Sequence, residues 1–368
     1  MSEKCLQLQL QQSGLIPLEV ELTVKQGEIM VLLGPSGSGK TTILRSISGL
    51  YKPSSGQIIC NGNTWFNQKE QINISTQQRS VGFLFQHYAL FPHLTAKQNI
   101  GIALGHIEKT YRSDRAQQLM DMVHMQGLEH RFPHQLSGGQ QQRIALARAL
   151  ARDPDVLLLD EPFSAVDHQT RIKLIRELAQ LRDQLKMPVI HVTHDLNEAR
   201  RIADKICVIH HGKTLQVNTP DNIMSGPLTK EVASLIGHYN IFTGSIEKHD
   251  QALHKTYLKW LNYSLETPYQ PDLEIGKEVD WVIPTENIIL HRRDRPSKGE
   301  RENPVHGIIE EFIPLGETTS VSIKINGNEQ YLSLSVSTHV ARRNGLDKGG
   351  DISVSLLCER IHLMEKSV

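Results

Sequence analysis

A glycine-rich loop between a short apolar run and a helical pattern limits what this chain can fold into. Ile29–Leu33 (IMVLL) leads into GPSGSGKT at Gly34–Thr41, and TTILRSISGL follows. The loop matches the pattern G-x-x-x-x-G-K-S/T in its phosphate-binding context, after a strand and before a helix. Glycines let the backbone wrap closely around an anion and point N–H groups at it. The sequence therefore predicts a phosphate site on an α/β sheet.

Each residue of this loop has an expected part in holding a nucleotide. We expect the Lys40 ammonium to lie against the β- and γ-phosphates and the Thr41 hydroxyl to ligate Mg²⁺. ATP and Mg²⁺ are therefore the expected cofactors. The residues expected to contact the nucleotide here are Gly34, Pro35, Ser36, Gly37, Ser38, Gly39, Lys40, Thr41 and Thr42.

A second motif supplies acidic groups for the same site. The apolar run Val156–Asp160 (VLLLD) indicates a buried strand, and its terminal Asp160 is expected to reach the metal. Glu161, one residue further, is placed to polarise an attacking water as a general base. Taken alone, an acidic pair after a strand is more often a surface turn or the start of a helix. Its combination with the glycine loop reverses that preference.

A second glycine-rich stretch, LSGGQ at Leu136–Gln140, precedes the helical pattern QQRIALARALA. Ser137 is expected to cap this helix, and by itself the stretch would do no more than start it. However, Gly138 and Gly139 leave the helix N-terminus bare, and such a terminus attracts anions. Because the loop of Lys40 already holds one nucleotide, the sequence predicts that this second terminus serves a γ-phosphate presented by another copy of the chain.

LSGGQ directly upstream of VLLLDEP, behind GPSGSGKT, resembles the ATP-binding subunit of an ABC transporter over residues 1–235. The resemblance implies an α/β P-loop NTPase fold of ABC type, with a mixed sheet and a small helical subdomain at 88–150. It also implies a head-to-tail homodimer with two ATP molecules, each held between residues 34–42 of one subunit and the LSGGQ stretch of the other. The expected contacts there are Ser137, Gly138, Gly139 and Gln140.

The resemblance assigns further residues by position. Gln86, in RSVGFLFQ, resembles a glutamine that reaches Mg²⁺ and the water, while the following HYALFPHLT would meet the membrane subunit. Asp167, in SAVD, resembles a residue of the loop that crosses the dimer interface, and His194 resembles the switch histidine at the γ-phosphate. The expected catalytic residues are thus Glu161, His194 and Gln86, and the expected metal ligands are Thr41, Gln86 and Asp160.

The family resemblance assigns no role to His191 and leaves the adenine contact without its usual residue. Strand alternation places His191 on the opposite face from His194, so we expect catalysis not to depend on it. The family usually stacks adenine on an aromatic residue upstream of the glycine loop, but residues 1–39 contain no Phe, Tyr or Trp. Leu15 or Ile16 is the expected apolar contact instead.

Charge and cysteine content exclude several classes of protein. Forty Lys and Arg balance forty Asp and Glu, which gives no basic excess for binding nucleic acid. The four cysteines form no CxxC pair, so reduced thiols are favoured over disulfides or a zinc site. No apolar run approaches the ~18 residues of a membrane helix. We expect a subunit peripheral to the cytoplasmic face of the cell membrane, bound to transmembrane permease subunits and served by a solute-binding protein. A soluble ABC ATPase without transport is the alternative.

Beyond residue 240, short strand patterns separated by turn signals replace the alternation of strands and helices. Lys324–Gln330 (KINGNEQ) contains an Asn-Gly pair and predicts a hairpin. We therefore predict an ABC ATPase domain at 1–237 and an all-β, OB-like (TOBE) regulatory barrel at 238–368. The charged segment His291–Pro304 is expected to be a solvated connector within that barrel.

The C-terminal pattern is similar to the barrel of importers for molybdate, sulfate, ferric iron, sugars and polyamines. Glu302–Ile309 (ENPVHGII) and the IHLM ending favour the molybdate type, although its Ser-x-Arg-Asn segment is not intact. An inorganic oxyanion such as molybdate or sulfate is the expected cargo, with iron(III), a polyamine or a sugar as the alternative. The barrel either senses the imported solute, with basic residues of His291–Arg301 as donors, or only widens the dimer interface.

Overall fold

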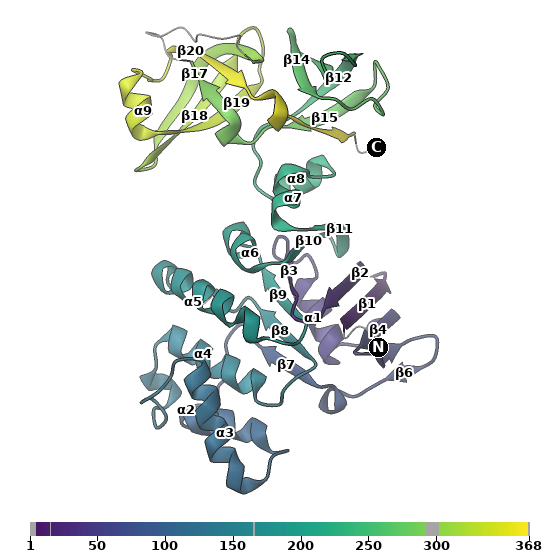
Figure 1. Ribbon diagram of the computed structural model, residues 1–368, viewed down its shortest axis with the longest axis vertical. Helices are drawn as coiled ribbons and strands as arrows, with labels where there is room; N and C mark the ends of the chain where they lie inside the picture. The colour runs from purple at the N-terminus through teal and green to yellow at the C-terminus, as the bar shows by residue number, and fades with distance from the viewer. Residues whose placement is uncertain (1–4, 15, 165, 292–301, 367–368) are drawn as a thin grey trace. The chain divides into compact units, whose positions relative to one another are not determined.

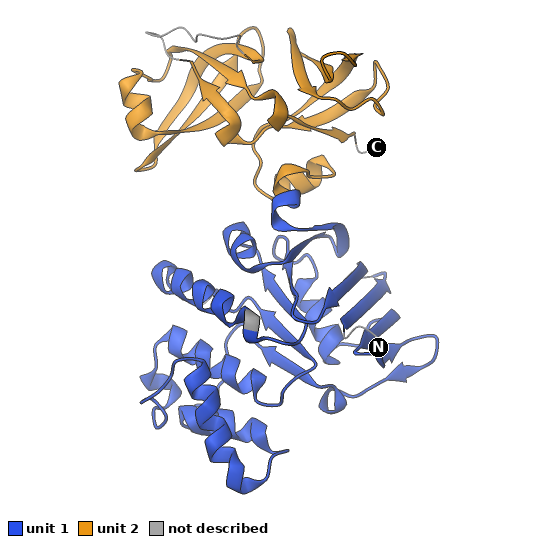
Figure 2. Cartoon of the chain, in the orientation of Figure 1, with its two compact units in different colours: residues 1–223 blue, residues 224–368 orange. Residues whose placement is uncertain are grey.

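The computed structural model describes residues 5–14, 16–164, 166–291 and 302–366. The chain forms two compact units, which divide between Ile223 and Met224 (Figure 2). The domain boundary expected between residues 237 and 238 lies further along, after the short helix α8 (Lys230–Leu235). The end of the ATPase domain at residue 237 stays a prediction.

The first unit is built on one mixed sheet, whose described strands run in the order β6-β5-β4-β1-β2-β11-β10-β3-β9-β8-β7. The strands β10, β3, β9, β8 and β7 are neighbours in parallel, whereas β1, β2, β4, β5 and β6 pair antiparallel. Their bounds are β1 Cys5–Gln12, β2 Leu18–Lys25, β3 Ile29–Leu33, β4 Ser55–Cys60, β5 Asn63–Asn67, β6 Ile72–Asn73, β7 Val81–Leu84, β8 Val156–Asp160, β9 Val189–Thr193, β10 Lys205–His210 and β11 Lys213–Asn218.

The amino-acid pattern explains which strands form the centre of this sheet. Every residue of β3, β8 and β9 is buried, as expected for parallel strands covered on both faces. In β1, by contrast, Leu6, Leu8 and Leu10 are buried while the intervening glutamines are exposed. The helices beside the parallel strands are α1 (Lys40–Ser48), α5 (His168–Leu181) and α6 (Leu196–Ile202) (Figure 1).

The order of the parallel strands brings distant parts of the sequence to one edge of the sheet. Because β3, β9, β8 and β7 are parallel neighbours, their carboxyl ends meet on the same side. The glycine loop follows β3, Glu161 follows β8, His194 follows β9 and Gln86 follows β7. Such an edge is where ligands bind in open α/β sheets.

A small helical part completes the first unit. It contains α2 (Ala96–Gly101), α3 (Lys109–Met122) and α4 (Gly138–Leu150), and α2 packs against both of the others. Figure 1 shows these helices gathered beyond β7, away from the antiparallel strands. The predicted α/β fold with a mixed sheet and a helical subdomain is confirmed. Among the residues that the structure describes, no helix is long and apolar enough to cross a membrane.

The described residues of the second unit form two antiparallel sheets, ordered β14-β13-β12-β15-β21 and β16-β20-β17-β18-β19. A single cluster of buried residues joins them, with Trp260 and Trp281 from the first sheet and Ile323 and Leu334 from the second. The all-β barrel-like domain is confirmed, although its strands are divided between two sheets. Their bounds are β12 Ile241–Asp250, β13 Lys255–Trp260, β14 Tyr263–Pro268, β15 Glu278–Val282, β16 Ile288–Leu290, β17 Pro304–Pro314, β18 Thr318–Ile325, β19 Tyr331–Ser337, β20 Asp351–Leu356 and β21 His362–Glu365.

Shorter features of this unit also bear on the sequence predictions. The hairpin predicted at Lys324–Gln330 joins β18 to β19, and Gly327 adopts a φ of 76° in its turn. The short helix α7 (Pro220–Ser225) spans the division between the two units, and the short helix α9 (Thr338–Arg343) follows β19. Most of the charged segment predicted as a connector, residues 292–301, lies outside the described residues.

Candidate functional site

The glycine loop forms a tight turn between β3 and α1. Gly37 and Gly39 adopt φ values of 81° and 95°, which other residues rarely tolerate. A Cβ atom at Gly34 would lie 2.1 Å from the Ile209 carbonyl oxygen, so the backbone itself passes too close for a side chain. Gly39 caps α1 without a side-chain bond, which leaves the first N–H groups of the helix to an incoming anion.

The Lys40 side chain turns back into this loop and is buried. Its Nζ donates to the carbonyl oxygens of Gly34 and Pro35, both at 2.8 Å, and to Ser38 Oγ at 3.3 Å. Burial lowers the pKa of Lys40, while the nearby carboxylates of Glu161 and Asp160 act in the opposite direction. The ammonium therefore lies inside the cradle, where phosphate oxygens can replace its carbonyl partners.

Asp160 and Thr41 form the metal side of the cradle. The Thr41 hydroxyl donates to Asp160 Oδ1 at 3.0 Å. Burial raises the pKa of the Asp160 carboxyl, and the Thr41 hydrogen bond opposes this. A carboxylate beside a hydroxyl fits Mg²⁺, which prefers oxygen ligands and keeps part of its coordination shell for water and phosphate. In the part of the chain that the structure describes, no group of three His, Cys, Asp or Glu side chains gathers to hold a metal.

Glu161 is the meeting point of the expected catalytic residues. It follows β8 in the left-handed conformation, with a φ of 43°. Gln86 Nε2 donates to its Oε2 at 3.4 Å, and His194 Nδ1 lies 3.5 Å from its Oε1. The side chain of Glu161 is 21% exposed and that of His194 is 57% exposed, so both can reach a ligand. The structure thus brings Gln86, Glu161 and His194 together from three adjacent strand ends.

The segment after Gln86 is held by a residue that the sequence patterns did not single out. Tyr88 and Ala89 adopt consecutive positive φ values of 60° and 46°, which is unusual for residues other than glycine. Arg148 of α4 donates to both of their carbonyl oxygens at 2.8 Å, and burial lowers its pKa. This Arg148 clamp ties the segment to the helix that begins with the LSGGQ stretch. A carbonyl contact leaves no pattern in the sequence by which it could have been found.

The LSGGQ stretch caps α4 as predicted, but the terminus is not bare. Gln140 N donates to Ser137 Oγ at 3.4 Å, and Ser137 N donates to Gln140 Oε1 at 2.9 Å, which makes a capping box. Close packing favours glycine at position 139, because a Cβ atom there would lie 3.0 Å from Thr170 Cγ2. Among the described residues, no hydrogen bond joins Ser137 or Gln140 to the glycine loop of the same chain.

Asp167 caps the next helix of the unit. Its Oδ1 accepts from Thr170 N at 3.0 Å, and the hydrogen bonds to Thr170 lower the pKa of the exposed Asp167 carboxyl. Within one chain this aspartate therefore stabilises the start of α5. Its neighbour Ala165 lies outside the described residues.

His191 is part of the buried core of the first unit. It is completely buried on β9, where its Nε2 forms a hydrogen bond with the buried Glu198 of α6. The phenyl ring of Phe163 lies 5.8 Å from the imidazole. The expectation that His191 faces away from the site is compatible with this position, but the residue is part of the core and its removal will affect folding.

The expected adenine contacts are placed only in part. Leu15 lies outside the described residues, and Ile16 is 40% exposed. Gln12 Nε2 donates to both the Ile16 carbonyl oxygen and the Tyr51 hydroxyl at 2.7 Å. Tyr51, three residues beyond the end of α1, is therefore linked to this segment through Gln12. Because Tyr51 follows the glycine loop in the sequence, it was not among the expected contacts.

Comparison with known proteins agrees with this geometry. Residues 18–164 match the family described as "ABC transporter". A sulfate/thiosulfate import ATP-binding protein of Synechocystis sp. is 44% identical over 317 residues, which are 86% of this chain and 82% of that protein. A Synechococcus elongatus protein of the same description is 46% identical over 230 residues, 62% of this chain and 65% of that protein.

Other relatives differ in described cargo. A spermidine/putrescine import ATP-binding protein of Oleidesulfovibrio alaskensis is 37% identical over 312 residues, which are 83% of this chain and 80% of that protein.

Among solved structures, CbiO1 of Clostridium perfringens, described as part of an ABC transporter complex, aligns with a TM-score of 0.55 at 24% identity. That alignment covers 60% of this chain and 91% of CbiO1, and it supports the fold of the first unit alone.

Proposed function

The chain belongs to the family of ATP-binding subunits of ABC importers, which hydrolyse ATP to drive transport, and we propose that this one powers uptake of sulfate or thiosulfate. The observation that supports this choice of cargo is the similarity to the Synechocystis protein, because it extends into both compact units at 44% identity. Its description names sulfate and thiosulfate.

The glycine loop holds the phosphates of ATP in this proposal. Lys40 leaves the carbonyl oxygens of Gly34 and Pro35 and pairs with the β- and γ-phosphates, since a charged partner is the stronger acceptor. Asp160 and Thr41 hold Mg²⁺, with Gln86 as a further ligand on the same side. When bound, the metal would neutralise negative charge on the phosphate oxygens.

Glu161 acts as the general base in this proposal. Its carboxylate orients a water and accepts its proton as the water attacks the γ-phosphate. Gln86 and His194 hold the carboxylate from two sides through its two oxygens. Because the His194 side chain is 57% exposed, against 21% for Glu161, we assign it to the contact with the γ-phosphate. These roles assign the catalytic set as Glu161, His194 and Gln86.

The complete ATP site needs two copies of the chain in this proposal. The stretch Ser137–Gln140 and the exposed Asp167 have no hydrogen bonds to the glycine loop of their own subunit among the described residues. In a head-to-tail homodimer the helix N-terminus at Gly138 and Gly139 would face the γ-phosphate bound by the partner. The capping box would open or rotate to admit that phosphate.

Membrane attachment comes from partners in this proposal. Three large aromatic side chains of this part of the chain are exposed: Phe85 and Phe91 in the segment that follows β7, and Tyr111 on α3. Exposed aromatic residues of this kind suit a protein interface. We assign this surface to the transmembrane permease subunits, which places the chain at the cytoplasmic face of the membrane, with a solute-binding protein as an indirect partner.

A polyamine is the second candidate cargo, because the Oleidesulfovibrio relative is described as a spermidine/putrescine import protein. The test is complementation of a strain that lacks the ATPase subunit of its own sulfate importer, using this chain with its permease. Uptake of radiolabelled sulfate that is lost with Lys40→Ala supports the proposal. Uptake of spermidine but not sulfate would identify a polyamine as the cargo. Uptake of molybdate but not sulfate would identify molybdate as the cargo.

The second unit keeps two alternative roles. In one it binds the imported anion and slows the ATPase halves; in the other it only extends the dimer interface. The measurement is ATP turnover of the assembled full-length transporter in the presence of internal sulfate, molybdate or phosphate. Inhibition of several-fold, typical of allosteric coupling, would favour sensing. The basic residues proposed as donors belong to His291–Arg301. His291 is described, and its Nε2 forms a hydrogen bond with Ser355 Oγ at 2.7 Å, whereas residues 292–301 lie outside the described residues.

A further inference from the structure

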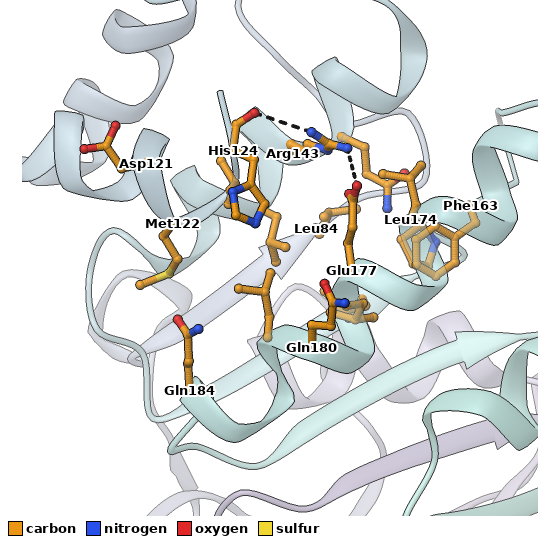
Figure 3. Close-up of a pocket in the computed structure, with 17 residues that line it drawn as sticks. Leu84, Asp121, Met122, His124, Arg143, Phe163, Leu174, Glu177, Gln180 and Gln184 are labelled. Atoms are coloured by element: carbon orange, nitrogen blue, oxygen red, sulfur yellow. Dashed lines mark hydrogen bonds and ion pairs between the residues drawn. The ribbon is translucent and has the colours of Figure 1, made fainter. Parts of the chain in front are cut away.

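A cavity of about 410 Å³ lies in the first unit, between the helical part and the parallel strands. Figure 3 shows its two walls. One wall is formed by the end of α3 and by α4, with Met122, His124 and Arg143. The other comes from the segment after β8 and from α5, with Phe163 and Leu174. None of the residues assigned above to ATP hydrolysis lines this cavity, so it is separate from the nucleotide site.

The size and lining of the cavity suit a small organic molecule. Pockets that bind such molecules have volumes of about 300–1,000 Å³ and are mostly apolar, with a few polar groups that orient the ligand. Here the apolar surface comes chiefly from leucines, including Leu146 on α4 and Leu174 and Leu178 on α5. All three side chains belong to the buried core.

Two polar atoms at this lining are buried and have no hydrogen-bond partner among the residues that the structure describes. They are Gln142 Oε1 and Arg143 Nε–H, and Gln142 is only 6% exposed. Buried polar atoms are rarely left unpaired, because each loses its water without compensation. An acceptor and a donor are both needed here. Hydroxyl groups supply both, since each carries one O–H donor and two acceptor lone pairs.

The charged groups of the lining favour a ligand without net charge. The Arg143 guanidinium is already paired with the Glu177 carboxylate, with Nη2 and Oε1 2.5 Å apart. Figure 3 shows this pair bridging from α4 to α5 beside the cavity. An anionic or cationic ligand would have to break the pair in order to find its own counter-charge, whereas a neutral one leaves it intact.

We propose that this cavity binds a small uncharged molecule that has an apolar ring and a hydroxyl group, and that the bound molecule slows ATP turnover. The second half of this statement rests on the ATPase function proposed above. The first half concerns binding alone.

The position of the walls explains the effect on turnover. Leu159 immediately precedes Asp160, and Pro162 immediately follows Glu161; both line the cavity. On the opposite wall Gln142 lies two residues after Gln140, on the helix that the LSGGQ stretch begins. A molecule that fits between the walls at this separation favours the conformation in which they stay apart, by its difference in affinity for the two states. Steps of hydrolysis that move α4 against β8 are therefore slowed.

The test uses two probes of the same shape, 2-naphthol and 2-methoxynaphthalene, with binding to the full chain measured by calorimetry. We expect 2-naphthol to bind about tenfold more tightly, as a hydrogen bond to a buried group allows. The Gln142→Leu variant removes the buried acceptor, and there the two probes should bind with similar affinity. Equal affinities for the wild-type chain would mean that the cavity does not recognise a hydroxyl, and would overturn the ligand class.

A filling variant tests the location. Leu178→Trp occupies the cavity and should abolish binding of both probes, whereas Leu50→Trp, at an exposed position, should leave binding unchanged. Binding that survives Leu178→Trp, or no saturable binding to the wild-type chain, would exclude this site. If Leu178→Trp protein does not fold, the loss of hydroxyl preference in Gln142→Leu decides the location instead.

The regulatory half is tested on ATP turnover of the wild-type chain at saturating 2-naphthol. Turnover should fall several-fold, and it should not respond to the probe in the Leu178→Trp variant. Binding without any change in turnover would refute regulation while leaving the site. If the chain hydrolyses no ATP at all, the proposed function fails, and the calorimetric result still stands by itself.

Discussion

The side-chain amide of Gln86 donates to the Glu161 carboxylate across 3.4 Å, although 75 positions separate the two residues in the sequence. Gln86 opens the segment that Arg148 holds through the carbonyl oxygens of Tyr88 and Ala89. The proposed general base is therefore linked, through one side chain, to the surface that we assign to the permease. Movement of that surface can reach the carboxylate without any change in the glycine loop.

The two histidines of the β9 region should respond differently to replacement. His194→Ala should remove most ATP hydrolysis with little loss of stability, because the side chain is 57% exposed and lies 3.5 Å from Glu161. His191→Ala should instead lower the free energy of unfolding by about 3 kcal/mol, because it leaves the buried Glu198 without its partner. Chemical denaturation and ATP turnover, measured on both variants, separate the two effects. Equal loss of turnover in two equally stable variants would contradict the assigned role of His194.

The Arg148 clamp predicts a loss of coupling. In Arg148→Lys the ammonium cannot reproduce the fork that binds two carbonyl oxygens at once, so the strained turn at Tyr88 and Ala89 should relax. We expect stimulation of ATP turnover by the permease to fall several-fold, while turnover of the isolated subunit changes less. Hydrogen exchange in residues 87–91 should rise in the same variant. Unchanged exchange together with unchanged stimulation would show that the clamp has no such part.

The sequence predicted the parts of the site that depend on local spacing. The glycine loop, Asp160 with Glu161, and the Ser137 cap each follow from residues adjacent in the chain, so a pattern could identify them. The pairing of strands depends on residues that are distant in the sequence. Runs such as IMVLL and VLLLD nevertheless indicated buried parallel strands correctly, because a strand buried on both faces shows no alternation of polar and apolar residues. The positions of Gln86 and His194 came from the family resemblance.

Contacts between distant backbone and side-chain atoms were not predictable in this way. Arg148 binds carbonyl oxygens, which every residue carries, so nothing in the sequence marks its partners. The Gln12–Tyr51 hydrogen bond depends on where the end of β1 passes the segment that follows α1. In the second unit, short antiparallel strands gave the correct class but not the division into two sheets, because which strands become neighbours is decided by packing around Trp260 and Trp281.

The half-buried His362 predicts a pH dependence of stability in the second unit. Burial lowers the pKa of His362 below its ordinary value of 6.5, and its Nε2 forms a hydrogen bond with the Pro227 carbonyl oxygen at 2.9 Å. The unfolded chain thus binds the proton more readily than the folded one. The contribution of the neutral imidazole is therefore present above pH 6.5 and is lost as the pH falls through the lower, folded value.

The comparison is between the wild-type chain and His362→Gln, whose amide can still donate to the Pro227 carbonyl oxygen. Thermal unfolding from pH 7.5 to pH 5, followed by fluorescence, should show a smaller decrease in the melting temperature of the second unit for the variant. The other histidines contribute equally to both proteins and cancel in the difference. Identical pH profiles would mean that His362 does not titrate in this range.

A mixing experiment tests the site shared between two subunits. Ser137→Arg leaves Lys40 intact but places bulk and positive charge at the start of α4, whereas Lys40→Ala leaves Ser137 intact. Each variant alone should be inactive, and their heterodimer should contain one complete site and regain part of the turnover. Two tags with tandem purification isolate the heterodimer. A pure heterodimer that binds ATP but shows no recovery would count against a single composite site acting alone.

The most direct measurement is ATP turnover and oligomeric state of the Glu161→Gln variant at saturating ATP and Mg²⁺. The amide keeps the shape of the carboxylate and its contact with Gln86 but cannot accept a proton, so hydrolysis should fall by ~10²-fold or more while ATP binding persists. With ATP retained between two subunits, the variant should elute as a dimer, and Lys40→Ala should stay monomeric under the same conditions. Hydrolysis by Glu161→Gln at a rate near that of the wild-type chain would contradict the account.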